Sequence, residues 1–284
     1  MSTELKSKKR TFKPIDSRQP TVRKMDFETM SDLPSHYFAG NSFITHMINA
    51  YHILFPEGER FFIRSVKAFS DRVVDPQLQT NIKAFIGQEV QHGKEHEKVL
   101  EILAQQGRPV KRFIRFFEWS AFRVMLPFFE FFFGKKLKLS VTAGMEHYTA
   151  TMGEITLRHG FHEKTYGEMR NLLLWHACEE IEHKSVAYDL LQTVSNSYTL
   201  RIFGFFLASW IFWGYVVFFQ HWFLLTDPGI GWKKYFQDMN SSREYGRILI
   251  AETAKAFFLY LKPGFHPAQT GGYEMEDRAL STII

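Results

Sequence analysis

The sequence predicts an all-α protein built around four long helices. Apolar residues recur with a helical period over most of the chain, and no run of alternating β-branched residues is long enough to indicate a sheet. Gly and Pro clusters separate the helical segments. A composition of 45% hydrophobic and 23% charged residues is typical of a globular protein, which excludes collagen-like and fully disordered classes.

The expected helices follow from these breaks. We expect helices over residues 40–54, 57–71, 76–106, 113–133, 137–160, 165–195, 198–225 and 241–262. The breaks between them fall at Pro56, Asp75-Pro76, Gly107-Arg108-Pro109, Gly134, Gly160, Asp227-Pro228-Gly229 and Pro263-Gly264. Because Pro76 directly follows Asp75, we expect the Asp75 side chain to cap the helix that Pro76 opens. The chain after Pro267 is expected to be irregular.

A basic segment near the start accounts for the net charge of +5. Residues 1–24 contain eight Lys or Arg against two acidic residues, a net charge of +6, whereas the rest of the chain carries −1. We therefore expect a basic, disordered N-terminal arm over residues 1–30, a helical domain over 31–267 and a C-terminal tail over 268–284. Such an arm is solvated or contacts anionic lipid. Because the domain has no basic stripe, no nucleic-acid partner is expected.

The cysteine content bears on the compartment. Cys178 is the single cysteine, so no internal disulfide can form, and the sequence begins without a signal-peptide pattern. We expect a cytoplasmic protein, attached to or embedded in the inner membrane if its apolar segments contact lipid.

Two Glu-x-x-His motifs carry the chemistry of the sequence. Glu89 and His92 form one, Glu180 and His183 the other, and the spacing puts both side chains of each pair on one helix face. A single copy of this motif is weak evidence, because a solvated helix charge is the more common explanation. Each copy, however, follows a Glu in the preceding long helix. This order is the ligand set of a four-helix-bundle di-iron or di-manganese carboxylate site.

The residue types suit such a site. Four carboxylates carry four negative charges, which two divalent cations would balance, whereas buried carboxylates without compensation are costly. Mixed oxygen and nitrogen ligands favour iron or manganese over zinc or copper(I). His176 adds a third imidazole, because His176, Glu180 and His183 at positions i, i+4 and i+7 lie within roughly 60° of one another on a helix.

Several alternatives stay open at this stage. Glu57 competes with Glu59, which we prefer because Glu57 follows Pro56 and suits a helix N-terminus. Glu154 competes with Glu146, which we prefer because its neighbours are small or uncharged. His96 shares the face of Glu89 and is a partner of the ligands or an ordinary polar residue. Other nearby residues are given structural roles: Glu182 points away, Glu179 lies at the edge of the arc, and Cys178 serves in packing.

Two apolar segments need a separate explanation. The 25 residues between Arg201 and Asp227 contain no Asp, Glu, Lys or Arg. A helix over residues 202–226 would be about 37 Å long, enough to cross a bilayer. A buried helix of the bundle or a helix at a dimer interface would have the same apolar composition. Residues 113–133 contain ten aromatic residues among 21 and would lie along a membrane face or cover the metal cavity.

The motifs taken together resemble a known family. The resemblance rests on FPEGERFF (55–62), QEVQHGKEH (88–96), MEHYT (145–149), WHACEEIEH (175–183) and KPGFHP (262–267). These segments are similar to the bacterial family of predicted metal-dependent hydrolases, which belongs to the ferritin-like superfamily, and the similarity runs from about residue 30 to residue 267. The fold that it implies is a ferritin-like four-helix bundle with additional apolar helices.

The metal set also resembles that of the di-iron arylamine N-oxygenases, which have the same order of ligands. The similarity implies as metal ligands Glu59, Glu89, His92, Glu146, His176, Glu180 and His183. The four carboxylates of this set are the candidate catalytic residues. The two apolar segments depart from those oxygenases, so their substrate is not carried over.

We expect a dinuclear enzyme with two iron ions, or manganese or a mixed pair, that activates O₂ to oxidise an apolar or aromatic substrate. The alternatives are a metal-dependent hydrolase that uses a metal-bridged hydroxide and a non-catalytic, membrane-associated metal-binding protein. The expected partners are an apolar small-molecule substrate, an electron donor in the oxygenase case, a membrane surface and a second copy of the chain.

Overall fold

The fold is all-α, as predicted. The computed structural model describes residues 19–27, 30 and 32–283, and its secondary structure within these ranges is helical apart from one isolated bridge between Phe38 and Thr165. The α-helices are α1 (Ser42–Lys67), α2 (Pro76–Gln105), α3 (Val110–Phe117), α4 (Leu126–Phe133), α5 (Lys135–Arg158), α6 (Glu168–His183), α7 (Val186–Val194), α8 (Tyr198–Thr226), α9 (Trp232–Ser241), α10 (Arg243–Tyr260) and α11 (Tyr273–Leu280). The 3₁₀ turns are η2 (Ser70–Arg72), η4 (Phe161–Lys164) and η5 (Pro267–Thr270), and a π-helix, η3 (Glu118–Met125), joins α3 to α4.

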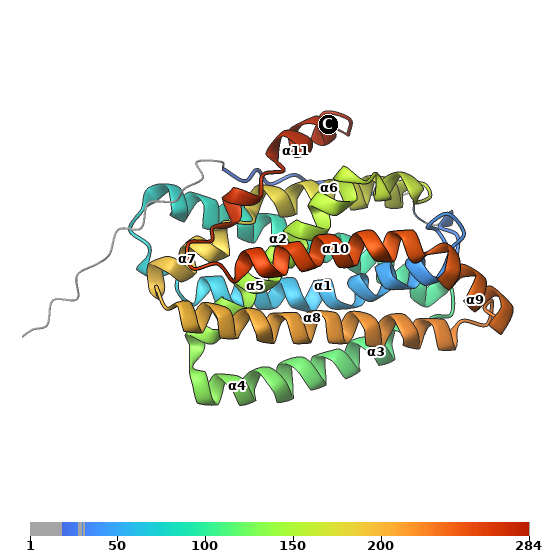
Figure 1. The fold of residues 1–284 in the computed structure, drawn as a ribbon, viewed down its shortest axis with the longest axis horizontal. Helices are drawn as coiled ribbons and strands as arrows, with labels where there is room; N and C mark the ends of the chain where they lie inside the picture. The colour runs from blue at the N-terminus through green and yellow to red at the C-terminus, as the bar shows by residue number, and fades with distance from the viewer. Residues whose placement is uncertain (1–18, 28–29, 31, 284) are drawn as a thin grey trace, which may run out of the picture.

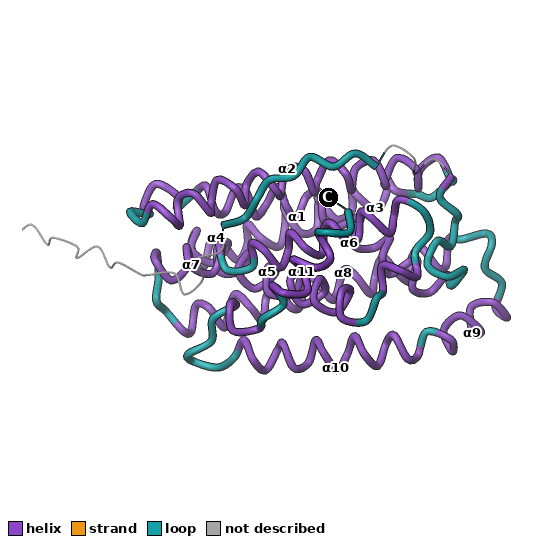
Figure 2. The backbone as a smooth tube through the Cα atoms, turned by 90° about the horizontal axis from the view of Figure 1, so that it is seen from above, coloured by secondary structure: helices purple, strands orange, loops and turns teal. Residues whose placement is uncertain are grey.

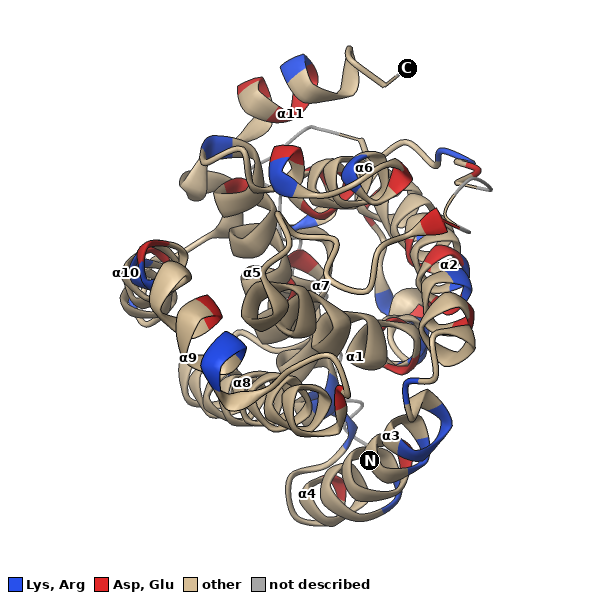
Figure 3. Cartoon of the chain, turned by 90° about the vertical axis from the view of Figure 1, so that its right-hand side faces the viewer, with Lys and Arg blue, Asp and Glu red and all other residues tan. Residues whose placement is uncertain are grey.

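Four helices surround a common interior. Figure 3, which looks along the length of the molecule, shows α1, α2, α5 and α6 arranged around the centre. Helix α8 lies along α1 and α5 on one side, and the α3–η3–α4 segment lies beyond it (Figure 1). Helix α10 covers α5 on another side (Figure 2). Because α5 has neighbours all around it, nearly every residue from Leu137 to Thr151 is buried.

Helix α1 corrects the expected break at Pro56. The two segments predicted on either side of this proline form one continuous helix, which Asn41 caps by accepting a hydrogen bond of 3.0 Å from the Ile44 amide. An interior proline costs about 3 kcal/mol because it removes one backbone hydrogen bond and crowds the preceding turn. Helix α1 packs along both α2 and α8, and burial on two sides outweighs that local cost. Helix α2 starts as predicted, with Asp75 accepting from the Leu78 amide at 2.8 Å.

The region expected as one helix over 165–195 is divided. Helix α6 ends at His183, and α7 begins at Val186. The break falls at Lys184, whose ammonium is buried and donates to Thr270 Oγ1 at 2.8 Å and to Glu154 at 3.3 Å. These contacts hold the chain after α6 against the C-terminal residues.

The C-terminal tail is not irregular, which corrects a second expectation. The turn η5 and helix α11 follow Pro267, and α11 packs on α6, where Leu280 joins Leu174 and Cys178 in a small apolar cluster. Cys178 is buried in this packing. Helix α9 is a further element that the sequence analysis placed in a loop.

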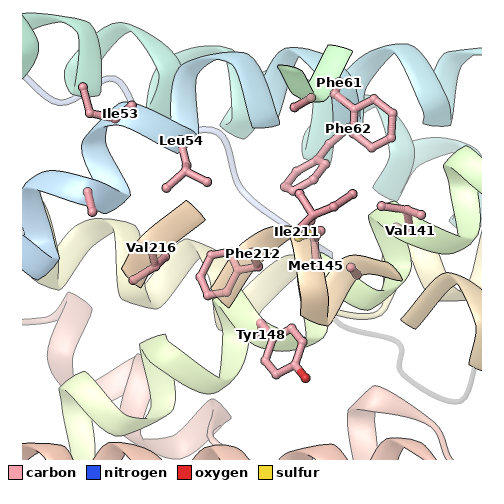
Figure 4. Packing of buried hydrophobic residues seen from close by; sticks show 14 of the residues in the cluster. Ile53, Leu54, Phe61, Phe62, Val141, Met145, Tyr148, Ile211, Phe212 and Val216 are labelled. Carbon is pink, nitrogen blue, oxygen red and sulfur yellow. The ribbon is translucent and has the colours of Figure 1, made fainter. Parts of the chain in front are cut away.

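The core between α1, α5 and α8 is aromatic and aliphatic. Figure 4 shows Leu54, Phe61 and Phe62 of α1 facing Met145 of α5 and Phe212 of α8. Much of the unusual Phe content is therefore used inside the bundle. Most of the exposed Phe side chains lie on α4 and α8, and Phe236 of α9 and Phe258 of α10 are exposed as well.

Helix α8 is both a bundle helix and an apolar surface. Its 29 residues and a mean hydropathy of 2.0 satisfy the length and composition of a membrane span, with 44% of the most apolar window buried inside the molecule. The segment 110–133, named here the aromatic arm, includes residues 113–133, which were expected to form one helix. Its backbone widens into a π-helix before Pro127, which then opens α4.

The described part of the expected basic arm lies on the bundle. Residues 1–18 and 28–29 lie outside the described residues. The N-terminal segment 19–27 runs along α2 (Figure 2), where Pro20 and Phe27 are buried and the ring of Phe27 lies 5.8 Å from that of Trp175.

Candidate metal centre

The structure brings all seven candidate ligands together in the interior of the bundle. Helix α1 supplies Glu59, α2 supplies Glu89 and His92, α5 supplies Glu146, and α6 supplies the remaining three. All seven side chains are buried. Charged and polar groups are rarely buried unless they are paired or bind a metal.

The candidate ligand atoms form three overlapping groups, and within each group all the atoms lie within 4.8 Å of one another. The groups are Glu59, His92 and His176; Glu89, His92 and Glu180; and Glu89, Glu146 and His183. Two of these groups share His92 and two share Glu89. The cluster is thus elongated, with Glu59 and His176 at one end and Glu146 and His183 at the other.

The contacts at the two ends are short. His183 Nε2 lies 3.2 Å from Glu146 Oε2 and 3.3 Å from Glu89 Oε1. At the other end, His176 Nε2 lies 2.9 Å from Glu180 Oε1 and 4.0 Å from Glu59 Oε1. Imidazole nitrogens and carboxylate oxygens therefore face one another across a small interior space.

The donor atoms of the cluster fit a metal ion. Within the described part of the chain, both carboxylate oxygens of Glu59, Glu89 and Glu146 and the Nδ1 atom of His92 are buried without a hydrogen-bond partner. Leaving a buried polar group unsatisfied costs about 1–3 kcal/mol, and more for a charged group. Divalent cations would satisfy these oxygens and balance their charge, which is the reason to treat the cluster as a metal centre.

The pKa values show the effect of burying these charged groups in the metal-free protein. Burial raises the pKa of Glu59 and Glu89 well above the usual range, and burial also raises the pKa of Glu146 to about 7. Burial would lower the pKa of His92, but the hydrogen bond with Glu179 and the nearby carboxylate of Glu180 outweigh it and raise that pKa to about 9. The cluster therefore holds protons when it holds no cation.

An outer ring of side chains orients two of the imidazoles. His92 Nε2 hydrogen-bonds Glu179 Oε2 at 3.0 Å, which leaves His92 Nδ1 facing the centre. His183 Nδ1 contacts Gln88 Oε1 at 3.0 Å, which leaves His183 Nε2 toward the carboxylates. Outer partners of this kind fix the tautomer and ring orientation of metal-binding histidines.

The outer ring continues to the surface. The Gln88 amide donates to Glu182 Oε2 at 2.6 Å, and Arg23 of the N-terminal segment donates to Glu182 at 2.9 Å and to Glu179 at 3.3 Å. Glu179 and Glu182 were expected to have no role at the centre, and Gln88 and Arg23 were not predicted as part of it. The position of Gln88, one turn before His92, is a signal that could have found it.

The structure also places the residues that competed with the candidate ligands. Glu57 hydrogen-bonds Arg60 near the surface, and Glu154 accepts from Thr270 at 2.8 Å, so neither lies in the cluster. His96 lies beside the cluster, with Nε2 3.7 Å from Glu59 Oε1 and Nδ1 2.8 Å from His52 Nδ1. Of the two readings for His96, the structure places it as a neighbour of the candidate ligands.

Comparison with known proteins identifies the family of the chain. The family described as predicted metal-dependent hydrolases matches residues 21–271, which is most of the chain and includes all seven candidate ligands. The chain belongs to this family. No curated protein and no solved structure shows significant similarity to the chain.

In this member of the family of predicted metal-dependent hydrolases, an apolar cavity of about 140 Å³ ends on His176 and Glu180. Its walls come from α1, α5, α6 and α10 and include Tyr51, Phe55 and Tyr245. The described lining contains no Lys or Arg, so the cavity suits an uncharged, apolar ligand. A second apolar cavity, of about 40 Å³, lies beneath the aromatic arm and reaches Glu59.

A second histidine and carboxylate cluster lies near the start of α1. His36 Nε2 and His46 Nε2 each lie 2.8 Å from Asp227 Oδ2, while Asp227 Oδ1 is 2.8 Å from both Arg108 Nη1 and the Gly229 amide. Both carboxylate oxygens already have hydrogen-bond partners, and the Arg108 guanidinium balances the charge. This cluster therefore fastens the loops after α2 and α8 to α1 and differs from the central cluster, whose carboxylate oxygens lack partners.

Proposed function

We propose that the chain is a dinuclear metal-dependent enzyme whose ions are held by the seven clustered side chains. The observation that carries this proposal is the set of buried, unsatisfied carboxylate oxygens of Glu59, Glu89 and Glu146, which face three imidazoles. Each of the four central helices contributes at least one of these groups, so the bundle itself would form the site.

The first proposed reaction is hydrolysis of an uncharged ester or amide with apolar substituents. Family membership supports hydrolysis, and metal ions lower the pKa of bound water so that it becomes a nucleophile near neutral pH. The apolar cavity would seat the apolar part of the substrate against His176 and Glu180. An anionic phosphoester fits less well, because the described lining offers no cation.

Tyr51 would assist by donating a hydrogen bond inside this cavity. Burial raises the pKa of its hydroxyl well above the usual range, so the group stays protonated. Its acceptor in the structure is the Met152 sulfur at 3.9 Å, a weak partner that also lines the cavity. A substrate carbonyl oxygen would be a stronger acceptor and would be oriented by this exchange.

The second proposed reaction is O₂-dependent oxidation of an apolar substrate by an iron or manganese pair. It is favoured by the ligand set, four carboxylates and three imidazoles without sulfur, which suits these redox-active metals. The similarity of this ligand order to that of the ferritin-like di-iron arylamine N-oxygenases supports the same reading. An apolar cavity that excludes water would also protect a reactive oxidant.

Metal analysis followed by two assays distinguishes hydrolysis from oxidation. The purified protein is expected to contain close to two transition-metal ions per chain, and variants Glu89→Gln and His183→Gln to contain fewer. Turnover of neutral aryl and alkyl esters under anaerobic conditions would support hydrolysis. O₂ consumption by the reduced, iron-loaded protein, increased by apolar compounds, would support oxidation. A metal-free protein that cannot be loaded would overturn the proposal.

A further inference from the structure

A continuous aromatic surface runs along one side of the molecule. We name it the aromatic face and define it by the exposed side chains Trp119, Phe128, Phe131, Phe132 and Phe133 of the arm and Phe203, Phe206, Trp210 and Phe218 of α8. Phe131 is 83% exposed, and Phe132 and Trp210 are each 61% exposed. Soluble monomers rarely expose a contiguous apolar patch of this kind without an interaction partner.

The two parts of the face are joined at both ends. At the end of the arm, in α4, the Phe133 ring lies 4.6 Å from that of Phe203. Near its start, in α3, the Phe116 ring lies 5.2 Å from that of Phe218. On α8 the exposed positions Phe203, Phe206 and Trp210 follow helical spacing, so they form one stripe. The arm and α8 therefore present a single surface parallel to the long axis of the molecule (Figure 1).

The charges around this face are basic. Residues 110–138 contain seven Lys or Arg against two Glu, and one of these acids, Glu130, is paired with Lys138. Lys111, Arg112 and Arg115 are exposed at the start of the arm, and Lys135 and Lys136 are exposed just after it. Figure 3 shows that α4 and α8 are almost free of charge, whereas α3 carries a cluster of basic residues.

We propose that the aromatic face docks on an anionic lipid bilayer, with the long axis of the bundle lying in the membrane plane. Aromatic side chains insert at the boundary between headgroups and acyl chains, and the flanking Lys and Arg pair with anionic headgroups. Helix α8 contacts α1 and α5 along its inner side, so only its outer stripe is available to lipid and the helix lies on the membrane without crossing it.

Charge also decides between a bilayer and a second copy of the chain. In a twofold dimer formed through this face, the face would meet its own image. The basic ends of two arms would then approach each other with few acids to neutralise them. An anionic surface satisfies the same groups, and each basic residue near such a surface contributes about 1 kcal/mol.

The docking position would bring lipid close to the centre. The second cavity lies beneath the arm, lined by Phe117, Ala121 and Phe122 of the arm, and ends at Glu59. Figure 4 shows the apolar side chains of α1, α5 and α8 that form its other walls. Docking does not depend on the proposed reaction, and it can be tested on protein without activity.

Vesicle flotation of the full-length chain tests the proposal. The wild type is expected to bind phosphatidylcholine vesicles that contain phosphatidylglycerol and to bind pure phosphatidylcholine more weakly. The double variant Phe131→Ser/Phe132→Ser should weaken partitioning about tenfold or more, because it removes two inserted rings. Lys135→Gln/Lys136→Gln should weaken binding to the anionic vesicles at low salt, with the difference shrinking at high salt.

Matched controls use exposed residues elsewhere. Tyr166→Ser removes a ring that is 58% exposed on the loop before α6, and Lys83→Gln removes an exposed charge on α2; neither should change partitioning. The basic residues of segment 1–24 are the same in every variant, so differences report on the face. Equal binding by the wild type and the Phe131/Phe132 variant would overturn the proposal. So would a dimer in lipid-free buffer that this variant converts to a monomer.

Discussion

At the scale of single residues, the centre depends on which nitrogen of each imidazole is available. Glu179 holds His92 by Nε2, and Gln88 holds His183 by Nδ1, so the two rings present different nitrogen atoms to the same space. Arg23 in turn holds Glu179 and Glu182. These outer contacts would set the ligand geometry before any ion arrives.

The first prediction concerns Glu179. In Glu179→Gln the carboxylate that accepts from His92 becomes a weaker amide acceptor, and the ring loses its fixed orientation. We expect metal affinity to fall about 10- to 100-fold, the range typical of outer partners of metal-binding histidines. Competition with a chelator measures this affinity. The matched control Glu97→Gln changes an exposed carboxylate on α2 and should leave it unchanged; equal affinities for both variants would contradict the prediction.

The second prediction concerns Glu89 in the metal-free protein. Burial raises its pKa well above the usual range, so at pH 7 folding must either bury a charge or bind a proton. Glu89→Gln removes this cost, and we expect the free energy of unfolding of the metal-free protein to rise by about 1 kcal/mol. Metal should then stabilise the variant less than the wild type.

Urea unfolding with and without added metal measures both effects. Glu101→Gln, on an exposed position of the same helix, serves as the control and should behave as the wild type. A metal-free Glu89→Gln protein that is less stable than the wild type would contradict the prediction.

The candidate ligands were predictable because they follow helical spacing, whereas their outer partners were not. Glu180 and His183 share a face whatever the tertiary structure, and so do Glu89 and His92. Contacts such as Arg23 with Glu182 join residues 159 positions apart, and no local pattern encodes them. The preference for Glu59 over Glu57 rested on a helix start after Pro56, which the structure does not have because α1 is continuous there.

At the scale of elements, packing decided the points on which local signals misled. Pro56 predicts a helix end, but α1 continues because α2 and α8 pack along it. Lys184 carries no breaker signal, yet α6 ends there because a buried ammonium is drawn to Glu154 and Thr270. The breakers at Asp75-Pro76 and Gly134 did set the starts of α2 and α5.

The third prediction concerns the close approach of α8 to α5. A Cβ atom at Gly204 would lie 2.9 Å from the backbone carbonyl carbon of Ser140, which cannot move aside without displacing α5. We expect Gly204→Ala to reduce the free energy of unfolding by about 2 kcal/mol. Gly214, on the same helix, has no atom near its Cβ position, so Gly214→Ala should raise it by roughly 0.5–1 kcal/mol.

Denaturant unfolding of the two variants under identical conditions provides the measurement. Because both substitutions add the same methyl group to α8, propensity alone would give them the same sign. Opposite signs identify packing against α5 as the cause. A Gly204→Ala variant as stable as Gly214→Ala would show that the two helices are not held this closely.

At the scale of the whole molecule, the Asp227 cluster joins parts of the chain that are far apart in sequence. Asp227 follows α8, Arg108 follows α2, and His46 lies in α1, where its ring stacks on Phe223. Burial would raise the pKa of Asp227, but hydrogen bonds from His46, Arg108 and His36 outweigh it and hold that pKa well below the usual value. Burial lowers the pKa of His46.

The sign of the resulting pH dependence is the same for both groups. A histidine with a lowered folded pKa favours folding at pH values above its ordinary pKa of about 6.5, and this contribution is lost as the pH falls below that value. The contribution of Asp227 is lost only at more acidic pH, below about 4. Between pH 7 and pH 5 the contribution of Asp227 is therefore constant, whereas that of His46 changes.

The fourth prediction is a comparison of the wild type with His46→Gln across this pH range. Three carboxylates of the centre, Glu59, Glu89 and Glu146, have raised pKa values and titrate with the opposite sign in both proteins, so only the difference between the two proteins isolates His46. We expect the stability advantage of the wild type in urea to shrink between pH 6.5 and pH 5, by up to about 1.4 kcal/mol per pH unit. His159→Gln replaces an exposed histidine and should follow the wild type at every pH. An advantage that stays constant or grows on acidification would show that His46 is not held neutral, and the fastening of α1 to the loop after α8 would then need another explanation.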